Sequence, residues 1–74
     1  MIDKEDLQVA IGKRIKSLRE ERNIHQQDLA AKCNIEKSNL SRLEAGNTNP
    51  TIYTLYKIAE NIGVSVSELT KIEN

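Results

Sequence analysis

The most distinctive chemistry in the sequence lies in a run of polar side chains between residues 37 and 42. Members of this run can donate hydrogen bonds through ammonium, hydroxyl, amide or guanidinium groups: Lys37, Ser38, Asn39, Ser41 and Arg42. Leu40 and Leu43 lie within and beside the run, three positions apart. If the stretch is helical, the two leucines form one face and the donors form the opposite face. Such a face suits a partner that is rich in hydrogen-bond acceptors.

A second short segment with helical periodicity precedes this one. Leu29, Ala30 and Cys33 share a face if residues 26–33 are helical, and Asn34 follows directly. Asparagine is among the residues that tolerate the left-handed conformation of a tight turn between helices. The small side chain of Ala30 would let two steeply crossing helices approach closely. We therefore predict a helix-turn-helix unit over residues 26–45, with its helices at 26–33 and 37–44.

This unit and its flanking pattern resemble the lambda-repressor-like (xenobiotic-response-element) helix-turn-helix family. The resemblance runs from about residue 11 to about residue 69 and rests on Leu18, Arg19, Gln26, Leu29, Ala30, Ser41, Arg42, Leu43, Glu44, Gly46, Asn49, Pro50, Leu55, Ile58, Ala59, Gly63, Val64 and Leu69. It implies an all-α fold of five short helices. The second and third of these would form the DNA-binding unit.

The resemblance also implies roles for individual residues. The expected base-reading residues on the third helix are Lys37, Ser38, Asn39 and Arg42. The expected phosphate contacts are Gln26, Gln27, Ser41, Asn47, Thr48 and Asn49, although Asn39 and Ser41 could serve either purpose. Lysine and arginine suit guanine O6 and N7, and asparagine suits adenine N6 and N7. In the family, an arginine of the first helix pairs with a glutamate at the end of the third, which implies an ion pair between Arg19 and Glu44. The other charged residues of the first helix are expected to face solvent.

Three features depart from the family pattern. His25 and Glu36 stand where Ser or Thr usually caps the second and third helices, so both helix starts should be less firmly fixed. A carboxylate at position 36 would also lie close to DNA, where it would either be repelled by phosphates or accept a hydrogen bond from a cytosine amino group, and so could shape specificity by exclusion. The loop at residues 47–49 is neutral where many relatives carry Lys or Arg, which predicts weaker and less salt-sensitive binding.

Periodicity predicts the remaining helices. A first helix at about residues 6–22, capped by Asp3 or Asp6, carries one apolar stripe: Leu7, Ile11, Ile15 and Leu18. A fourth helix begins after Thr51, ends at Gly63 and carries a second stripe: Ile52, Leu55, Ile58, Ala59 and Ile62. Ser65 and Glu68 have the spacing of a capping box that opens a fifth helix.

Burial of several side chains can be predicted from the same pattern. We expect Tyr53 and Tyr56 to be half-buried packing residues, and Cys33 to be a buried apolar filler. Leu69 should belong to the core. Val66 and Ile72 are expected to be exposed and to form a weak dimer interface.

Length and composition exclude several classes of protein. The chain has 74 residues, enough for one small domain over residues 1–74. One cysteine and one histidine cannot form an internal disulfide or a four-ligand zinc site, so we expect no metal and no cofactor. No set of nucleophile, base and orienting residue is apparent, which argues against an enzyme. Without a long apolar run or a basic and apolar leader, we expect a cytoplasmic protein with no membrane partner.

Net charge and local charge lead to opposite predictions about binding to nucleic acid. The net charge is zero and the pI is about 6.6, whereas polyanion binding usually requires a basic domain. Residues 13–22 nevertheless carry five basic and two acidic side chains, a local net charge of plus three. For binding to nucleic acid, the charge near the contact surface matters more than the net charge, because salt screens electrostatic interactions beyond roughly 8 Å at physiological ionic strength.

The sequence therefore predicts a sequence-specific DNA-binding transcriptional regulator of repressor or controller type. It would bind a palindromic operator in double-stranded DNA as a homodimer, with no small-molecule ligand. The alternative is a protein-interaction module or an antitoxin that uses the same fold with weak or no DNA binding. Zero net charge, Glu36 and the neutral loop favour that alternative.

Overall fold

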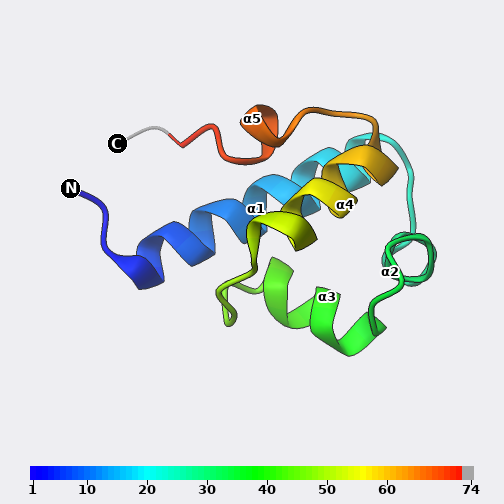
Figure 1. Ribbon diagram of the computed structural model, residues 1–74, viewed down its shortest axis with the longest axis horizontal. Coiled ribbons are helices and arrows are strands. Elements are labelled where there is room, and N and C mark those ends of the chain that lie inside the picture. The colour runs from blue at the N-terminus through cyan, green and yellow to red at the C-terminus, as the bar shows by residue number, and fades with distance from the viewer. Residues whose placement is uncertain (73–74) are drawn as a thin grey trace.

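The computed structural model describes residues 1–72, in which five helices and no strands form (Figure 1). In chain order they are α1 (Lys4–Glu21), α2 (Gln26–Lys32), α3 (Lys37–Glu44), α4 (Ile52–Ile62) and α5 (Val66–Leu69). The predicted all-α fold is confirmed. The first helix begins two residues earlier than predicted, because Asp3 rather than Asp6 is its N-cap. No helix in residues 1–72 is both long enough and apolar enough to cross a membrane.

Local sequence signals explain where most helices begin. The Asp3 carboxylate accepts a hydrogen bond from the Asp6 amide at 2.8 Å, and the Thr51 hydroxyl accepts one from the Thr54 amide at 3.1 Å. The predicted capping box of α5 is present, with Ser65 and Glu68 each accepting from the other's backbone amide. By contrast, α2 and α3 begin after His25 and Glu36 with no side-chain cap, as the departures at those positions predict.

Positive backbone φ angles mark the turns. Asn34 has φ of 57° in the break between α2 and α3, which confirms the predicted left-handed turn residue. Gly63 has φ of 94° and ends α4, also as predicted. These two residues set where the chain leaves one helix and enters the next.

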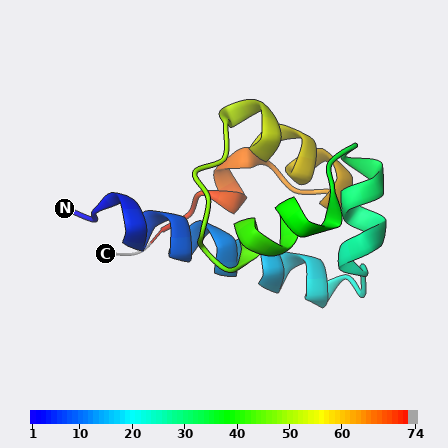
Figure 2. The ribbon, with the colours of Figure 1, turned by 90° about the horizontal axis from the view of Figure 1, so that it is seen from below.

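One apolar core joins all five helices. It contains Ile11, Ile15, Leu18, Leu29, Ala30, Cys33, Leu40, Leu43, Leu55, Ile58, Ala59, Ile62 and Leu69. The long helix α1 contacts α3, α4 and α5, while α2 contacts α3 and α4. Figure 2, which views the molecule from below, shows α3 in front with α2 at one end, and Figure 1 shows α1 and α4 lying above α3. The core thus fixes the helix-turn-helix unit to a scaffold made of α1, α4 and α5.

Several burial predictions are wrong. Leu7 and Ile52 belong to the predicted apolar stripes but are exposed, and Ile52 keeps 73% of its surface. Each precedes the part of its helix that packs on the core. Tyr53 is 67% exposed, so half-buried packing is wrong for it, and for Tyr56 at 49% exposure it holds only in part.

The predicted exposure of two C-terminal residues is also wrong. Val66 and Ile72 are half-buried and pack against the core, so they offer less apolar surface to a partner than predicted. Both lie beside the buried Leu69, and the chain around it folds back onto the body of the protein. The periodicity of apolar residues within a helix cannot predict that the C-terminal segment folds back onto the core.

Gly12 permits the close approach of α1 to α3. A Cβ atom at this position would lie 2.4 Å from the carbonyl oxygen of Leu43 and 2.7 Å from that of Glu44. Glycine inside a helix costs roughly 1 kcal/mol relative to alanine. The close helix contact accounts for its presence here, because any side chain would push the end of α3 away from α1.

We predict that Gly12→Ala destabilises the protein, because backbone atoms of α3 cannot move aside as a flexible side chain would. The expected loss is about 1 to 3 kcal/mol of unfolding free energy, the usual cost of overpacking. Urea denaturation measures it. Ser17→Ala, an exposed position on the same helix, is the control and should change stability by less than about 0.5 kcal/mol. Equal unfolding free energies of the two variants would show that α1 and α3 can move apart to accommodate the added methyl group without loss of stability.

Candidate nucleic-acid interface

A buried ion pair joins the first and third helices. The Nε and Nη2 atoms of Arg19 donate to the two carboxylate oxygens of Glu44 at 2.7 and 2.9 Å. The remaining nitrogen, Nη1, donates to the carbonyl oxygen of Ile24 at 2.8 Å. The hydrogen bond to Glu44 raises the pKa of Arg19 above its usual value, against the opposing effect of burial. The bidentate geometry is directional, so it fixes both the position and the orientation of the end of α3.

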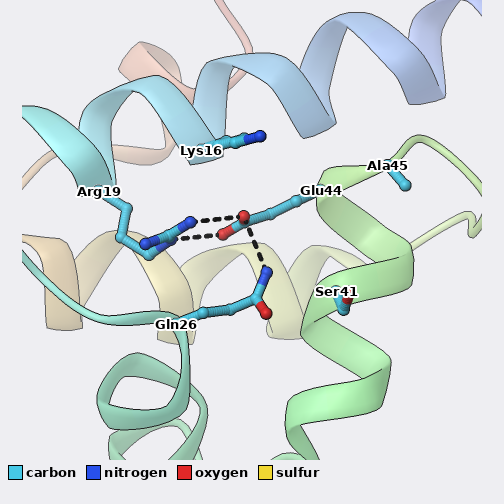
Figure 3. A pocket seen from close by; sticks show the side chains of 6 residues that line it. All are labelled: Lys16, Arg19, Gln26, Ser41, Glu44 and Ala45. Carbon is cyan, nitrogen blue, oxygen red and sulfur yellow. Dashed lines mark hydrogen bonds and ion pairs between the residues drawn. The ribbon is translucent and has the colours of Figure 1, made fainter.

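Gln26 extends this pair into a network of three helices (Figure 3). Its Nε2 donates to Oε1 of Glu44 at 3.0 Å. Arg19 comes from α1, Gln26 from the start of α2 and Glu44 from the end of α3. Sequence reasoning missed this bond because it assigned Gln26 only a phosphate contact. The amide keeps a second N–H, so the bond to Glu44 and a contact to phosphate are compatible.

The outer face of α3 is polar. Its exposed residues include all the candidates from the sequence: Lys37, Ser38, Asn39, Ser41 and Arg42. Leu40 and Leu43 are buried on the opposite face. Nη2 of Arg42 donates to Oδ1 of Asn39, one turn earlier. This contact orients both side chains and leaves the Asn39 NH₂ group free to donate elsewhere.

The start of α2 and the loop after α3 lie on either side of that face. His25, Gln26 and Gln27 line a shallow depression together with Lys37. Thr48 lines another depression together with Asn39, while Asn47 and Asn49 are exposed. Gln26 and Gln27 therefore lie beside the start of α3, and Thr48 lies beside Asn39, so the fold brings together candidates from α2, α3 and the loop that follows.

Cys33 lies inside the protein, away from this surface. Its Sγ is within 3.6 Å of the Lys57 carbonyl oxygen and 3.7 Å of Nδ2 of Asn61. Burial raises the pKa of the thiol, which therefore stays protonated at neutral pH. The predicted role of Cys33 as a buried filler is confirmed. Within residues 1–72, no three His, Cys, Asp or Glu side chains are grouped so as to hold a metal ion.

A pair of packed short helices joined by a tight turn, with an exposed polar face on the second, defines a helix-turn-helix protein. The helix-turn-helix family HTH_3 matches residues 15–69, and the chain belongs to this family of DNA-binding transcription regulators. The resemblance predicted from the sequence is thereby confirmed.

Individual relatives agree with this assignment. The chain is 38% identical over 64 residues to the uncharacterized HTH-type transcriptional regulator y4dJ of Sinorhizobium fredii, covering 86% of this chain and 83% of that protein. It is 31% identical over 65 residues to the control protein C.MunI of a Mycoplasma species, covering 86% and 88%. Among solved structures, the master regulator for biofilm formation SinR in complex with DNA matches with a TM-score of 0.75 and 42% identity, covering 80% and 95%. Other relatives are longer, and the chain spans 42% and 43% of two of them.

We predict that Glu44→Ala destabilises the protein by roughly 3 kcal/mol or more, because Arg19 would keep its buried position without its carboxylate partner. Urea denaturation measures this loss. Glu21→Ala removes an exposed carboxylate and should change stability by less than about 0.5 kcal/mol. A Glu44→Ala variant as stable as Glu21→Ala would contradict the structural role of the pair.

Proposed function

We propose that the protein is a sequence-specific transcriptional regulator, of repressor or controller type, whose helix α3 enters the major groove of DNA. The observation that carries this proposal is the exposed donor face of α3, held in a fixed orientation by the Arg19–Glu44 pair. A helix with an apolar inner face and donors on the outside fits the width of the groove and the acceptors on base edges. The SinR structure in complex with DNA supports the assignment.

Base reading is assigned to Lys37, Ser38, Asn39 and Arg42. The first two lie in the first turn of α3, where a recognition helix usually contacts bases. Asn39 also lies in the first turn, and Arg42, one turn further on, is already hydrogen-bonded to it. That bond limits the freedom of the Arg42 guanidinium, so less side-chain entropy is lost when it contacts a base.

Phosphate contacts are assigned to Gln26, Gln27, Ser41, Asn47, Thr48 and Asn49. These side chains are neutral hydrogen-bond donors, which can position the protein on the DNA backbone but release no counterions. Glu36 is exposed at the start of α3 and would disfavour sites that bring a phosphate close to it. Specificity therefore rests on donor geometry more than on charge.

We further propose that the protein acts in the cytoplasm as a homodimer on a palindromic operator, without a cofactor or small-molecule ligand. One module of this size buries roughly 600 to 1,000 Å² on DNA, and a second copy on a half-site one helical turn away adds affinity and symmetry. Val66 and Ile72 are the assigned dimer contacts. Each keeps part of its surface exposed at the edge of the core.

A protein-interaction module or an antitoxin is the second candidate. Ile52, Tyr53 and Tyr56 are exposed apolar residues on α4, outside the donor face of α3. Exposed aromatic surface on a small domain is typical of protein-binding sites. Titration with random-sequence duplex at low salt separates the candidates, because a DNA-binding protein binds even nonspecific duplex there and an interaction module does not.

The main prediction concerns selection of binding sites from a random duplex pool. The wild-type protein should enrich a palindrome whose half-sites are about ten base pairs apart. Arg42→Ala should lose preference at one base position in each half-site and about 1 to 3 kcal/mol of discrimination there. Arg22→Ala, which removes an exposed arginine at the end of α1, should enrich the same sequence as wild type. No enrichment by the wild-type protein at low salt would rule out the regulator and favour the second candidate.

Sedimentation equilibrium tests the homodimer. We expect a reversible monomer–dimer equilibrium in the micromolar range, because the half-buried Val66 and Ile72 leave a small contact area. Val66→Asp should shift this equilibrium toward monomer. A wild-type protein that remains monomeric at several hundred micromolar would overturn the dimer proposal while leaving DNA binding by a single module possible.

A further inference from the structure

A pocket lies between α1, the start of α2 and the end of α3, beside the donor face. Its lining residues are Lys16, Arg19, Gln26, Ser41, Glu44 and Ala45. Figure 3 shows Lys16 reaching over the Glu44 carboxylate from α1 while Gln26 approaches from the opposite side. Lys16 is one turn from both Gly12 and Arg19 on α1, so it lies on the side of α1 that faces α3. The sequence pattern placed this lysine among the solvent-facing charges.

The charges at the floor of the pocket cancel each other. All three nitrogens of Arg19 donate within the protein, two of them to Glu44. The Glu44 carboxylate in turn accepts three hydrogen bonds, including the one from Gln26. Neither group therefore offers a free charge to a ligand. Within residues 1–72, Lys16 makes no ion pair, and it gives the pocket a net positive charge.

We propose that this pocket holds one backbone phosphate of DNA, with Lys16 as the cation that binds it. The Ser41 hydroxyl and the second N–H of the Gln26 amide are the neutral donors beside it. This inference rests on the proposed function and extends it to a residue that neither the family resemblance nor the recognition helix includes. A phosphate fits because its oxygens accept from an ammonium and from neutral donors at once.

The position of the pocket favours a DNA phosphate over a free anion. Ser41 belongs both to the pocket lining and to the exposed face of α3, so the pocket borders the surface assigned to the major groove. A helix lying in the groove has the sugar-phosphate backbone along each side. Lys16 also supplies a charge that the neutral loop at residues 47–49 does not.

The test compares the salt dependence of binding to a random-sequence duplex for wild type and Lys16→Gln. Loss of one phosphate contact should make the slope of log K against log salt less negative by about 0.9. Between 50 and 200 mM salt, the wild type would then lose about three to four times more affinity than the variant. Lys16→Arg should restore the wild-type slope, because it retains the charge.

Lys4→Gln is the matched control. It removes the same charge from the same helix, about 18 Å away along the axis, and Lys4 does not line the pocket. Its slope should equal that of wild type. Equal changes in the two variants would assign Lys16 only a general electrostatic effect, and no change in Lys16→Gln would remove it from the interface. Absence of DNA binding by the wild type would overturn both this inference and the proposed function.

A neutral phosphate substitution identifies the contact directly. Methylphosphonates are placed one at a time in the duplex that the wild-type protein selects. One position should weaken binding of the wild type but not of Lys16→Gln, because that variant has already lost the charge at this phosphate. If every position that weakens the wild type weakens Lys16→Gln to the same degree, no phosphate depends on Lys16 and the proposal fails.

Discussion

The buried pair between Arg19 and Glu44 joins the end of α3, the proposed recognition helix, to α1, and the orientation of the donor face depends on it. It crosses the contact between α1 and α3, where Gly12 lets the backbones approach closely. Gln26 adds the first turn of α2 to the same carboxylate. Helices α2 and α3 have no side-chain cap at their starts, so this network is the side-chain contact that ties the start of α2 to the end of α3. The orientation of the donor face is thus determined by a part of the chain that does not belong to the helix-turn-helix unit.

Much of the fold could be predicted because its signals are local. Thr51, Ser65 and Gly63 mark helix boundaries through their own side-chain and backbone preferences, and Asn34 marks the central turn. The apolar seams of α2 and α3 follow from periodicity alone. The pairing of Arg19 with Glu44, across 25 positions, could be expected only from the family resemblance, because nothing local links the two residues.

The features that the sequence did not reveal are all tertiary. The exposure of Ile52 and Tyr53 depends on where the rest of the chain covers α4, and the half-burial of Ile72 depends on the return of the C-terminal segment. The hydrogen bond from Gln26 to Glu44 and the place of Lys16 beside it exist only once three helices converge. The distribution of charge over the surface also depends on the tertiary fold. A chain with zero net charge can present a positive pocket, because Glu44 is neutralised inside the fold.

The most direct test of this account is an NMR titration of ¹⁵N-labelled protein with the duplex that it selects. The account predicts that amide shifts change most in residues 26–27, 37–42 and 47–49, and that Lys16 broadens or shifts while the exposed face of α4 does not respond. Those amides come from three separate segments that only this arrangement of helices brings together. Changes concentrated at Ile52, Tyr53 and Tyr56 instead, or no change on addition of duplex, would contradict it.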